Sequence, residues 1–224
     1  MKIHLDTADI AEIRWAAEAG LIDGVTTDPT LLSRAAGTLD PRDVLREICA
    51  AVDGPVSAAV VSVDTEGMCR EGRELAKLAE NIVVQIPMIE EGLAATRLLS
   101  AEGIEINVAL VFSAMQGLLA ARAGASYVSP FVGPLDDVGH DGMEVVAQLR
   151  EIFATYDLET QILAAALRHP RHALQAALAG ADIAAMPAAV LRQLLLHPLT
   201  DRGLDRYLND WSKLGHRAIP EAAR

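Results

Sequence analysis

The sequence is poor in cysteine, with only Cys49 and Cys69 among its 224 residues. Both lie in stretches of helical periodicity, so we expect small buried side chains rather than a disulfide framework. Long apolar runs are also missing. The N-terminal segment reaches Asp6 too soon for a signal peptide, and no later segment has the roughly 18 uncharged residues of a membrane helix. These absences predict a cytoplasmic protein without a membrane partner.

Basic residues are scarce, because 19 Lys and Arg face 31 Asp and Glu and give a net charge of −12. Phosphate groups of nucleic acids and anionic lipids are bound by clustered Lys and Arg. The charge balance therefore argues against nucleic acid as a partner and leaves a small molecule as the expected ligand.

Several catalytic motifs are absent. The chain has no Gly-x-Ser-x-Gly elbow, no Cys-x-x-Cys and no Walker-type loop, which disfavours serine-nucleophile catalysis and nucleotide cofactors. His169 and His172 straddle Pro170, which is expected to begin a helix, and His140 stands apart from them. Zinc requires three or four converging ligands, so we favour structural or inter-subunit roles for these histidines and expect neither a metal nor an organic cofactor.

What the chain does contain is a regular alternation of short apolar runs and longer segments of helical period. Apolar strands of this kind suit a parallel sheet covered by helices, and eight of them match a closed barrel. The pattern predicts an α/β protein with the (β/α)8 TIM barrel fold. A doubly wound open sheet is the alternative, but no glycine-rich phosphate fingerprint follows the first strand. The expected strands are 2–6, 24–27, 55–61, 82–87, 106–112, 126–131, 161–167 and 182–186.

An extra amphipathic helix is expected over residues 200–214, after the eighth helix of the barrel. We therefore divide the chain into a barrel over 1–199 and a C-terminal helix and tail over 200–224. We expect the apolar stripe of this helix to pack on a neighbouring subunit, and packing on its own barrel is the alternative. The expected barrel helices are 10–19, 41–52, 64–79, 90–102, 113–123, 141–156, 171–179 and 187–195.

Reactive groups of a β/α barrel come from the C-terminal ends of its strands. Here those ends carry Asp6, Thr26, Thr27, Asp28 and Gln85 in otherwise apolar surroundings. A carboxyl group in an apolar pocket has a raised pKa and suits acid-base catalysis, so Asp6 and Asp28 are the candidate bases. Two structural alternatives remain open. Asp6 can cap the first helix, and Asp28, which precedes proline, can form a turn.

Short motifs along nearly the whole chain carry a family resemblance; they lie at 5–8, 24–30, 54–58, 81–84, 126–133, 162–165, 168–172 and 197–201. Together they resemble the small transaldolases and fructose-6-phosphate aldolases. That resemblance implies a class I aldolase barrel in which a lysine on the fourth strand forms a Schiff base with a ketose, assisted by an aspartate on the first strand. It also suggests a ring-like homo-oligomer, a pentamer or a decamer.

The same resemblance marks departures where the family's reactive groups are expected. Gln85 stands where the family's lysine is expected, and a glutamine amide cannot form an imine. The three lysines, Lys2, Lys77 and Lys213, are predicted to lie away from the barrel mouth. Further departures are Asp28 for Asn, Ala59 for Glu or Gln, Ile89 and Ala109 for Thr, Met115 for Asn, Pro134 for the phosphate-binding Arg, and Ala166 for Ser.

These differences indicate a rewritten pocket, such as specialisation or engineering would produce. One hypothesis is a lysine-independent lyase or isomerase acting on a small, largely apolar, non-phosphorylated substrate. Asp6 or Asp28 would be the base, and Gln85 would donate a hydrogen bond. Thr26, Ala59, Ile89, Ala109, Met115, Phe131, Pro134 and Ala166 would contact the substrate. A catalytically silent binding or oligomeric scaffold is the alternative, and weak aldol chemistry without an imine is a third possibility.

Overall fold

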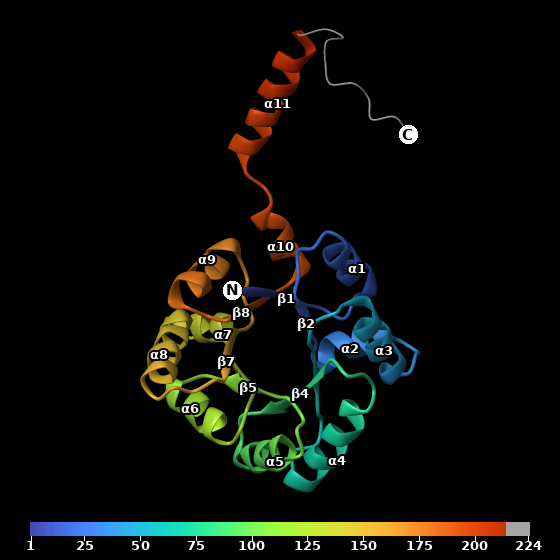
Figure 1. Cartoon of the computed structure of the whole chain (residues 1–224), viewed down its shortest axis with the longest axis vertical. Helices are drawn as coiled ribbons and strands as arrows, with labels where there is room; N and C mark the ends of the chain where they lie inside the picture. Colours follow the sequence, from blue (N-terminus) through green and yellow to red (C-terminus); the bar gives the residue numbers. More distant parts are fainter. Residues whose placement is uncertain (214–224) are drawn as a thin grey trace.

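The computed structural model describes residues 1–213, and eight parallel strands in it close into a barrel, β1 next to β2 through to β8, which pairs back with β1. Helices surround this ring (Figure 1). The predicted TIM barrel with an extra C-terminal helix is confirmed. The strands are β1 (Lys2–Asp6), β2 (Gly24–Thr26), β3 (Val56–Ala59), β4 (Ile82–Pro87), β5 (Ile106–Val111), β6 (Tyr127–Pro130), β7 (Gln161–Ala164) and β8 (Ile183–Met186).

Polar side chains mark the starts of several helices. Asp9, Asp40, Asp64, Ser113 and Asp141 each accept a hydrogen bond from a free backbone N–H of the helix that follows. The helices are α1 (Ile10–Glu18), α2 (Pro29–Ala36), α3 (Pro41–Ala51), α4 (Thr65–Ala76), α5 (Glu90–Ala101), α6 (Ala114–Arg122), α7 (Val132–Asp137), α8 (Gly142–Thr155), α9 (Pro170–Ala179), α10 (Ala188–Leu194) and α11 (Pro198–Lys213).

Two of these helices, α2 and α7, were not expected from the sequence. Asp28 accepts a hydrogen bond from the Leu31 N–H at 2.7 Å, and Pro29 occupies the first turn of α2, so an ordinary start signal was present. α7 has no side-chain cap and is only six residues long, which leaves little periodicity to detect. Both helices follow strand ends and therefore border the barrel mouth.

The core has two parts. The larger one fills the space between the strands and the outer helices, and includes Phe153, Leu149 and Ile13. The smaller one lies inside the barrel and contains Val83, Tyr127, Leu163, Ile183 and their neighbours. This inner cluster forms the apolar floor beneath the barrel mouth. Cys49 and Cys69 are buried free thiols, as expected.

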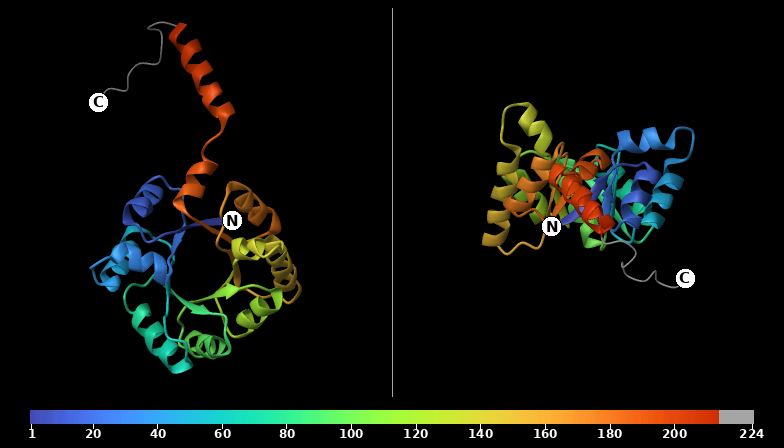
Figure 2. Two further views of the ribbon diagram at one scale, coloured as in Figure 1. Left: turned by 180° about the vertical axis from the view of Figure 1, so that it is seen from behind. Right: turned by 90° about the horizontal axis from the view of Figure 1, so that it is seen from above.

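Helix α11 extends away from the barrel (Figures 1 and 2). None of its residues is buried, so the alternative of packing on its own barrel is not observed. Leu214, predicted to end this helix, and the tail 215–224 lie outside the described residues.

Candidate functional site

A cavity of about 130 Å³ opens at the C-terminal ends of the strands, where a β/α barrel carries its reactive groups. Side chains from seven strands or strand ends surround it, and both polar and apolar groups contribute. The cavity is lined by Asp6, Thr26, Thr27, Asp28, Gln85, Asn107, Ser129, Phe131, Leu163, Ala165, Ala166 and Ala185.

Asp6 is the carboxyl group most strongly affected by this environment. It ends β1 opposite Thr26 of β2, whose hydroxyl donates to Asp6 Oδ1 at 3.1 Å. Burial raises the pKa of Asp6 to about 6; the Thr26 hydrogen bond opposes this shift and the nearby charge of Asp28 adds to it. A carboxyl group with this pKa is ionised at neutral pH and can accept a proton from a bound ligand.

Two roles were considered for Asp6, the cap of the first helix and a catalytic base. The cap of α1 is Asp9, which accepts from the N–H groups of Ala11 and Glu12. Asp6 therefore does not cap this helix, and its carboxylate faces the cavity. Asp28, for which a turn role was considered, is instead the N-cap of α2, and it also lines the cavity.

Asn107 and Ser129 are cavity residues that sequence reasoning missed. Ser129 Oγ donates to Asn107 Oδ1 at 2.7 Å, and Asn107 Nδ2 donates to Ser57 Oγ at 3.3 Å. These bonds fix the Asn107 amide so that its second N–H remains for a ligand oxygen. The expectation of an otherwise apolar mouth was therefore wrong. A buried asparagine inside an apolar strand was the available signal.

Thr26, Gln85, Phe131 and Ala166 line the cavity as expected, but five other predicted contacts are not part of its lining. Ile89 precedes α5 and Met115 lies in α6, with exposed fractions of 37% and 60%. Ala59, Ala109 and Pro134 are the remaining three.

Two residues at strand ends have left-handed backbone, which is unfavourable for side chains larger than glycine. Ala166, with φ 57°, follows β7 and lines the cavity. Leu110, with φ 58°, lies in a bulge where β5 shifts its register against β6. The two distortions lie on β5 and just after β7, and neither residue type predicts them.

Side chains of residues 168–172 connect the secondary-structure elements beside the cavity. His172 is buried, and its Nε2 lies 2.8 Å from Asp136 Oδ2 of α7, while His169 caps α9. Arg168 forms a two-point ion pair with Asp137 of the same helix. These contacts join α7 to the loop after β7. Within residues 1–213 no group of three or more His, Cys, Asp or Glu side chains is placed to hold a metal ion.

No lysine contributes to the cavity. Lys2 starts β1, Lys77 ends α4 and Lys213 ends α11, and the latter two pair with Glu74 and Asp210 on the surface. In the part of the chain that the structure covers, no helix is long and apolar enough to cross a membrane.

Comparison with known proteins places the chain in a family. The family described as Transaldolase/Fructose-6-phosphate aldolase matches residues 3–219. A "Probable transaldolase" of Aquifex aeolicus (strain VF5) is 55% identical over 214 residues, covering 96% of this chain and 98% of the relative.

A second relative, a "Probable transaldolase" of Methanococcus maripaludis (strain C7 / ATCC BAA-1331), is 54% identical over 94% of this chain and 97% of its own length. The solved thiamine phosphate pyrophosphorylase from Pyrococcus furiosus shares the fold. It has a TM-score of 0.57 and 19% identity, and the match covers 85% of this chain and 87% of that one. The chain belongs to the transaldolase/fructose-6-phosphate aldolase family.

Proposed function

We propose that this transaldolase-family barrel is a lysine-independent lyase or isomerase that uses Asp6 as its general base. The observation that carries the proposal is the Asp6 carboxylate, placed at the cavity with a pKa of about 6. A base of this strength is ionised at neutral pH yet still takes up a proton in the transition state. Proton abstraction next to a carbonyl group, or an elimination, fits this arrangement.

The remaining cavity groups support the same chemistry. The amides of Gln85 and Asn107 can donate hydrogen bonds to a substrate oxygen on which negative charge develops. We infer that Gln85 replaces the imine-forming lysine that the family resemblance places on β4. With no amine in the cavity, the hydrogen bonds from these amides would have to stabilise the negative charge that develops on the substrate oxygen. That limitation favours substrates whose proton is already acidic.

The substrate is proposed to be small and not phosphorylated. A cavity of about 130 Å³ has room for a few non-hydrogen atoms, and two of its walls carry carboxyl groups that repel an anion. Arg168 lies near the mouth, but its guanidinium group already forms an ion pair with Asp137 and is not available to bind a phosphate group. Polar groups at Asn107 and Ser129 favour a ligand with oxygen atoms, rather than the largely apolar one expected from the sequence.

A substrate screen tests this proposal. Small carbonyl and hydroxy compounds without phosphate are incubated with the protein between pH 4 and 8, and product is followed by NMR. We expect kcat/KM to rise with pH and level off above about pH 6, since only the ionised Asp6 accepts a proton. Binding without turnover of any compound would support the alternative, a catalytically silent scaffold.

Asp28 offers a second test of the assignment. Asp28→Asn keeps the hydrogen-bond acceptor for the Leu31 N–H and removes one negative charge near Asp6. Because the Asp28 charge raises the Asp6 pKa, the apparent pKa of kcat/KM should move below that of the wild type while turnover persists. Complete loss of turnover in Asp28→Asn, with turnover retained in Asp6→Asn, would make Asp28 the base.

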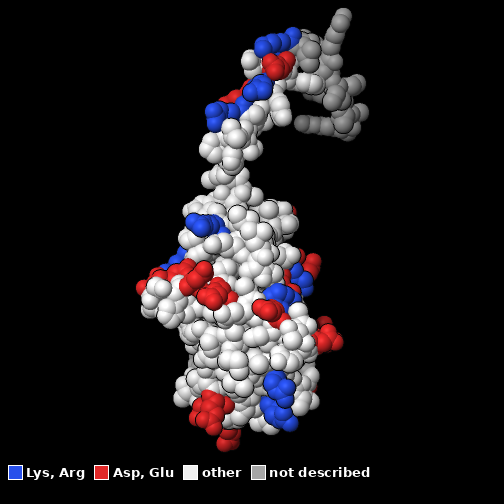
Figure 3. Space-filling model, turned by 90° about the vertical axis from the view of Figure 1, so that its left-hand side faces the viewer, with Lys and Arg blue, Asp and Glu red and all other residues white. Residues whose placement is uncertain are grey.

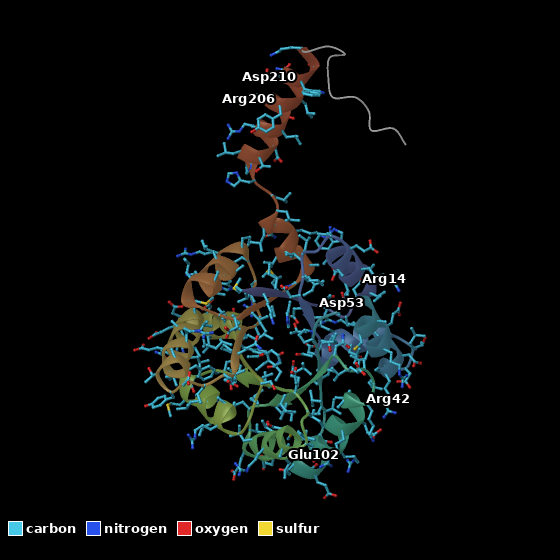
Figure 4. All side chains as sticks on the ribbon, viewed as in Figure 1. Arg14, Arg42, Asp53, Glu102, Arg206 and Asp210 are labelled. Carbon is cyan, nitrogen blue, oxygen red and sulfur yellow. The ribbon has the colours of Figure 1, made fainter. Side chains whose placement is uncertain are left out.

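We further propose that α11 packs on another copy of this chain. Leu204, Tyr207, Leu208 and Trp211 recur at helical spacing, and their exposed fractions run from 49% to 73%. Figure 3 shows that only a narrow connection joins this helix to the barrel, and in Figure 4 Arg206 and Asp210 lie far from it. Charges of both signs on the helix suit a repeated contact between copies. The two buried free thiols fit a cytoplasmic setting.

The assembly is tested with Leu208→Asp/Trp211→Asp, which places charges on the apolar stripe. We expect the wild type to show the mass of a homo-oligomer, a pentamer or decamer, by light scattering after size exclusion, and the variant to show that of a single chain. Asn209→Asp adds one negative charge elsewhere on α11 and should keep the assembly. A wild-type protein that is already a single chain would contradict this proposal.

A further inference from the structure

The loop after β7 places Ala166 at the cavity in a left-handed backbone conformation, with φ 57°. An alanine keeps this conformation only where the surrounding structure holds it. On one side of it, Ala165 is fixed by the Val132 N–H, which donates to its carbonyl oxygen at 3.1 Å. On the other side, the Arg168 N–H donates to His172 Nδ1 at 3.3 Å. Ala166 therefore lies between two anchors, and the second is a histidine side chain.

The partners of His172 define its tautomer. Nδ1 accepts from a backbone N–H and so carries no proton, which leaves the proton of a neutral ring on Nε2. Nε2 lies 2.8 Å from Asp136 Oδ2 and donates to it. Burial lowers the pKa of His172; His169 and Arg168 act in the same direction, and Asp136 opposes them. The ring is therefore neutral at neutral pH, and both of its nitrogens are satisfied.

Asp136 belongs to α7, which begins directly after the cavity residue Phe131. Helix α7 has no side-chain cap and only six residues, so contacts with its neighbours must hold it in place. Its backbone lies against the loop after β7, because a Cβ atom on Gly133 would lie only 2.7 Å from the Ala166 carbonyl oxygen. The hydrogen bond from His172 to Asp136 joins the same two segments at a further point.

We propose that His172 is a positioning residue, which keeps Ala166 and Phe131 in place at the cavity by bonding the loop after β7 through Nδ1 and α7 through Nε2. His172 itself does not line the cavity. Its effect on turnover rests on the proposed function, whereas its effect on the cavity lining does not. The ion pair between Arg168 and Asp137 joins the same segments, but its side chains are 50% and 55% exposed, so we expect it to contribute little.

The tautomer of His172 gives a spectroscopic test in the full chain. Ring ¹⁵N chemical shifts distinguish a nitrogen that carries a proton from one that does not. At neutral pH we expect a proton on Nε2 and none on Nδ1. A proton on Nδ1, alone or together with one on Nε2, overturns the proposal, because the Arg168 N–H would then have no acceptor on the ring.

Substitution of His172 tests its effect on the cavity lining. His172→Phe removes both hydrogen bonds, so the backbone amide signals of Ala166 and Phe131 should shift and broaden in NMR spectra, while that of Thr26 on β2 stays unchanged. Asp137→Asn, which removes only the exposed ion pair, is the control and should leave all three signals in place. Unchanged Ala166 and Phe131 signals in folded His172→Phe, or equal broadening at Thr26, would overturn the proposal.

Two partial replacements separate the roles of the ring nitrogens. His172→Asn places an oxygen near the position of Nδ1 and keeps an acceptor for the Arg168 N–H, whereas His172→Gln places an amide near Nε2 and keeps a donor for Asp136. We expect the Ala166 amide signal to stay nearer its wild-type position in His172→Asn than in His172→Gln. Equal shifts or the reverse order contradict the proposal, and this comparison replaces His172→Phe if that variant does not fold.

Kinetics test the consequence for catalysis. On any substrate that the screen identifies, His172→Phe should lower kcat/KM by about 10- to 100-fold, the usual effect of displacing groups around a bound substrate by about 1 Å. The pH profile should still level off above about pH 6, because Asp6 is unchanged. An unchanged kcat/KM, or a profile that loses its pH dependence, contradicts the positioning role. If no compound is turned over, the proposed function fails, and the NMR tests still decide the role of His172.

Discussion

Asp6→Asn is expected to lower turnover by about 10²- to 10⁴-fold, the usual contribution of a positioned general base. The side chain keeps its shape, and its oxygen can still accept the hydrogen bond from Thr26. Only the ability to take up a proton is lost. The measurement is kcat/KM on whichever substrate the screen identifies, and the residual rate should no longer change across pH 6.

The same variant should be more stable than the wild type at neutral pH. Folding raises the Asp6 pKa from 3.8 to about 6, which corresponds to about 3 kcal/mol of destabilisation when the group is ionised in both states. Asparagine avoids this charge burial but buries an amide, so we expect a net gain of about 1–3 kcal/mol, or roughly 3–10 °C in Tm. Chemical and thermal unfolding measure it.

The stability difference between Asp6→Asn and the wild type should depend on pH. Above pH 6 the wild type has the full penalty of a buried carboxylate. As the pH falls from 6 toward 3.8, the folded state takes up a proton before the unfolded state does, and the penalty disappears. The stability advantage of Asp6→Asn should therefore shrink over this range and vanish below it.

Asp9→Asn is the matched control, because it makes the same replacement three residues further along. Asp9 is exposed, and asparagine caps a helix as well as aspartate does, so turnover and stability should both stay near the wild-type values. If Asp6→Asn lowers stability and keeps turnover, Asp6 is a structural residue and the proposed base is wrong. Gain of stability with loss of activity is typical of residues kept for function.

The barrel could be predicted from the sequence because its signals are repeated eight times. Each strand is an apolar run, and each crossover has helical period, so an error at one element does not change the fold. The strand ends were less certain. The strand expected to reach residue 167 stops at Ala164, because the left-handed backbone at Ala166 interrupts it, and alanine gives no warning of that conformation.

The candidate site was only partly predictable for a related reason. Rules about strand ends identified Asp6, Asp28 and Gln85, because these residues lie at or close to the C-terminal ends of their strands. They missed Asn107, which lies near the start of β5 beside Gln85, and included Met115 of α6, which is 60% exposed. Whether a side chain enters the cavity depends on the β5 bulge and on helix starts, and these are set by packing between distant parts of the chain.

Gln85→Lys is expected to give the cavity an imine-forming amine. A lysine there can add to the carbonyl carbon of dihydroxyacetone and then lose water, and borohydride reduces the resulting C=N bond to a stable secondary amine. Burial lowers the pKa of such a lysine and favours its reactive neutral form, whereas the nearby Asp6 carboxylate opposes this. Mass spectrometry should find one reduced adduct, mapped to residue 85.

The wild type should give no adduct in the cavity, because its three lysines lie elsewhere. Gln161→Lys is the matched control: it places a lysine at the opposite end of a strand, at the start of β7, and should react no faster than the surface lysines. A wild-type adduct on a cavity residue would contradict the lysine-independent mechanism. A folded Gln85→Lys protein that forms no adduct would show that the cavity does not admit a carbonyl compound. That result would contradict the proposed substrate class.

The double variant Asp6→Asn/Gln85→Lys tests whether Asp6 transfers protons to a carbonyl compound bound at residue 85. Loss of water from the initial amine adduct requires an acid, and Asp6, with a pKa of about 6, is the group in the cavity able to supply a proton near neutral pH. Asp6→Asn/Gln85→Lys should therefore form the adduct more slowly than Gln85→Lys alone. Equal rates of adduct formation in the two variants would show that Asp6 does not act on the bound carbonyl compound. The cavity would then bind a ligand but lack an acid-base group for it.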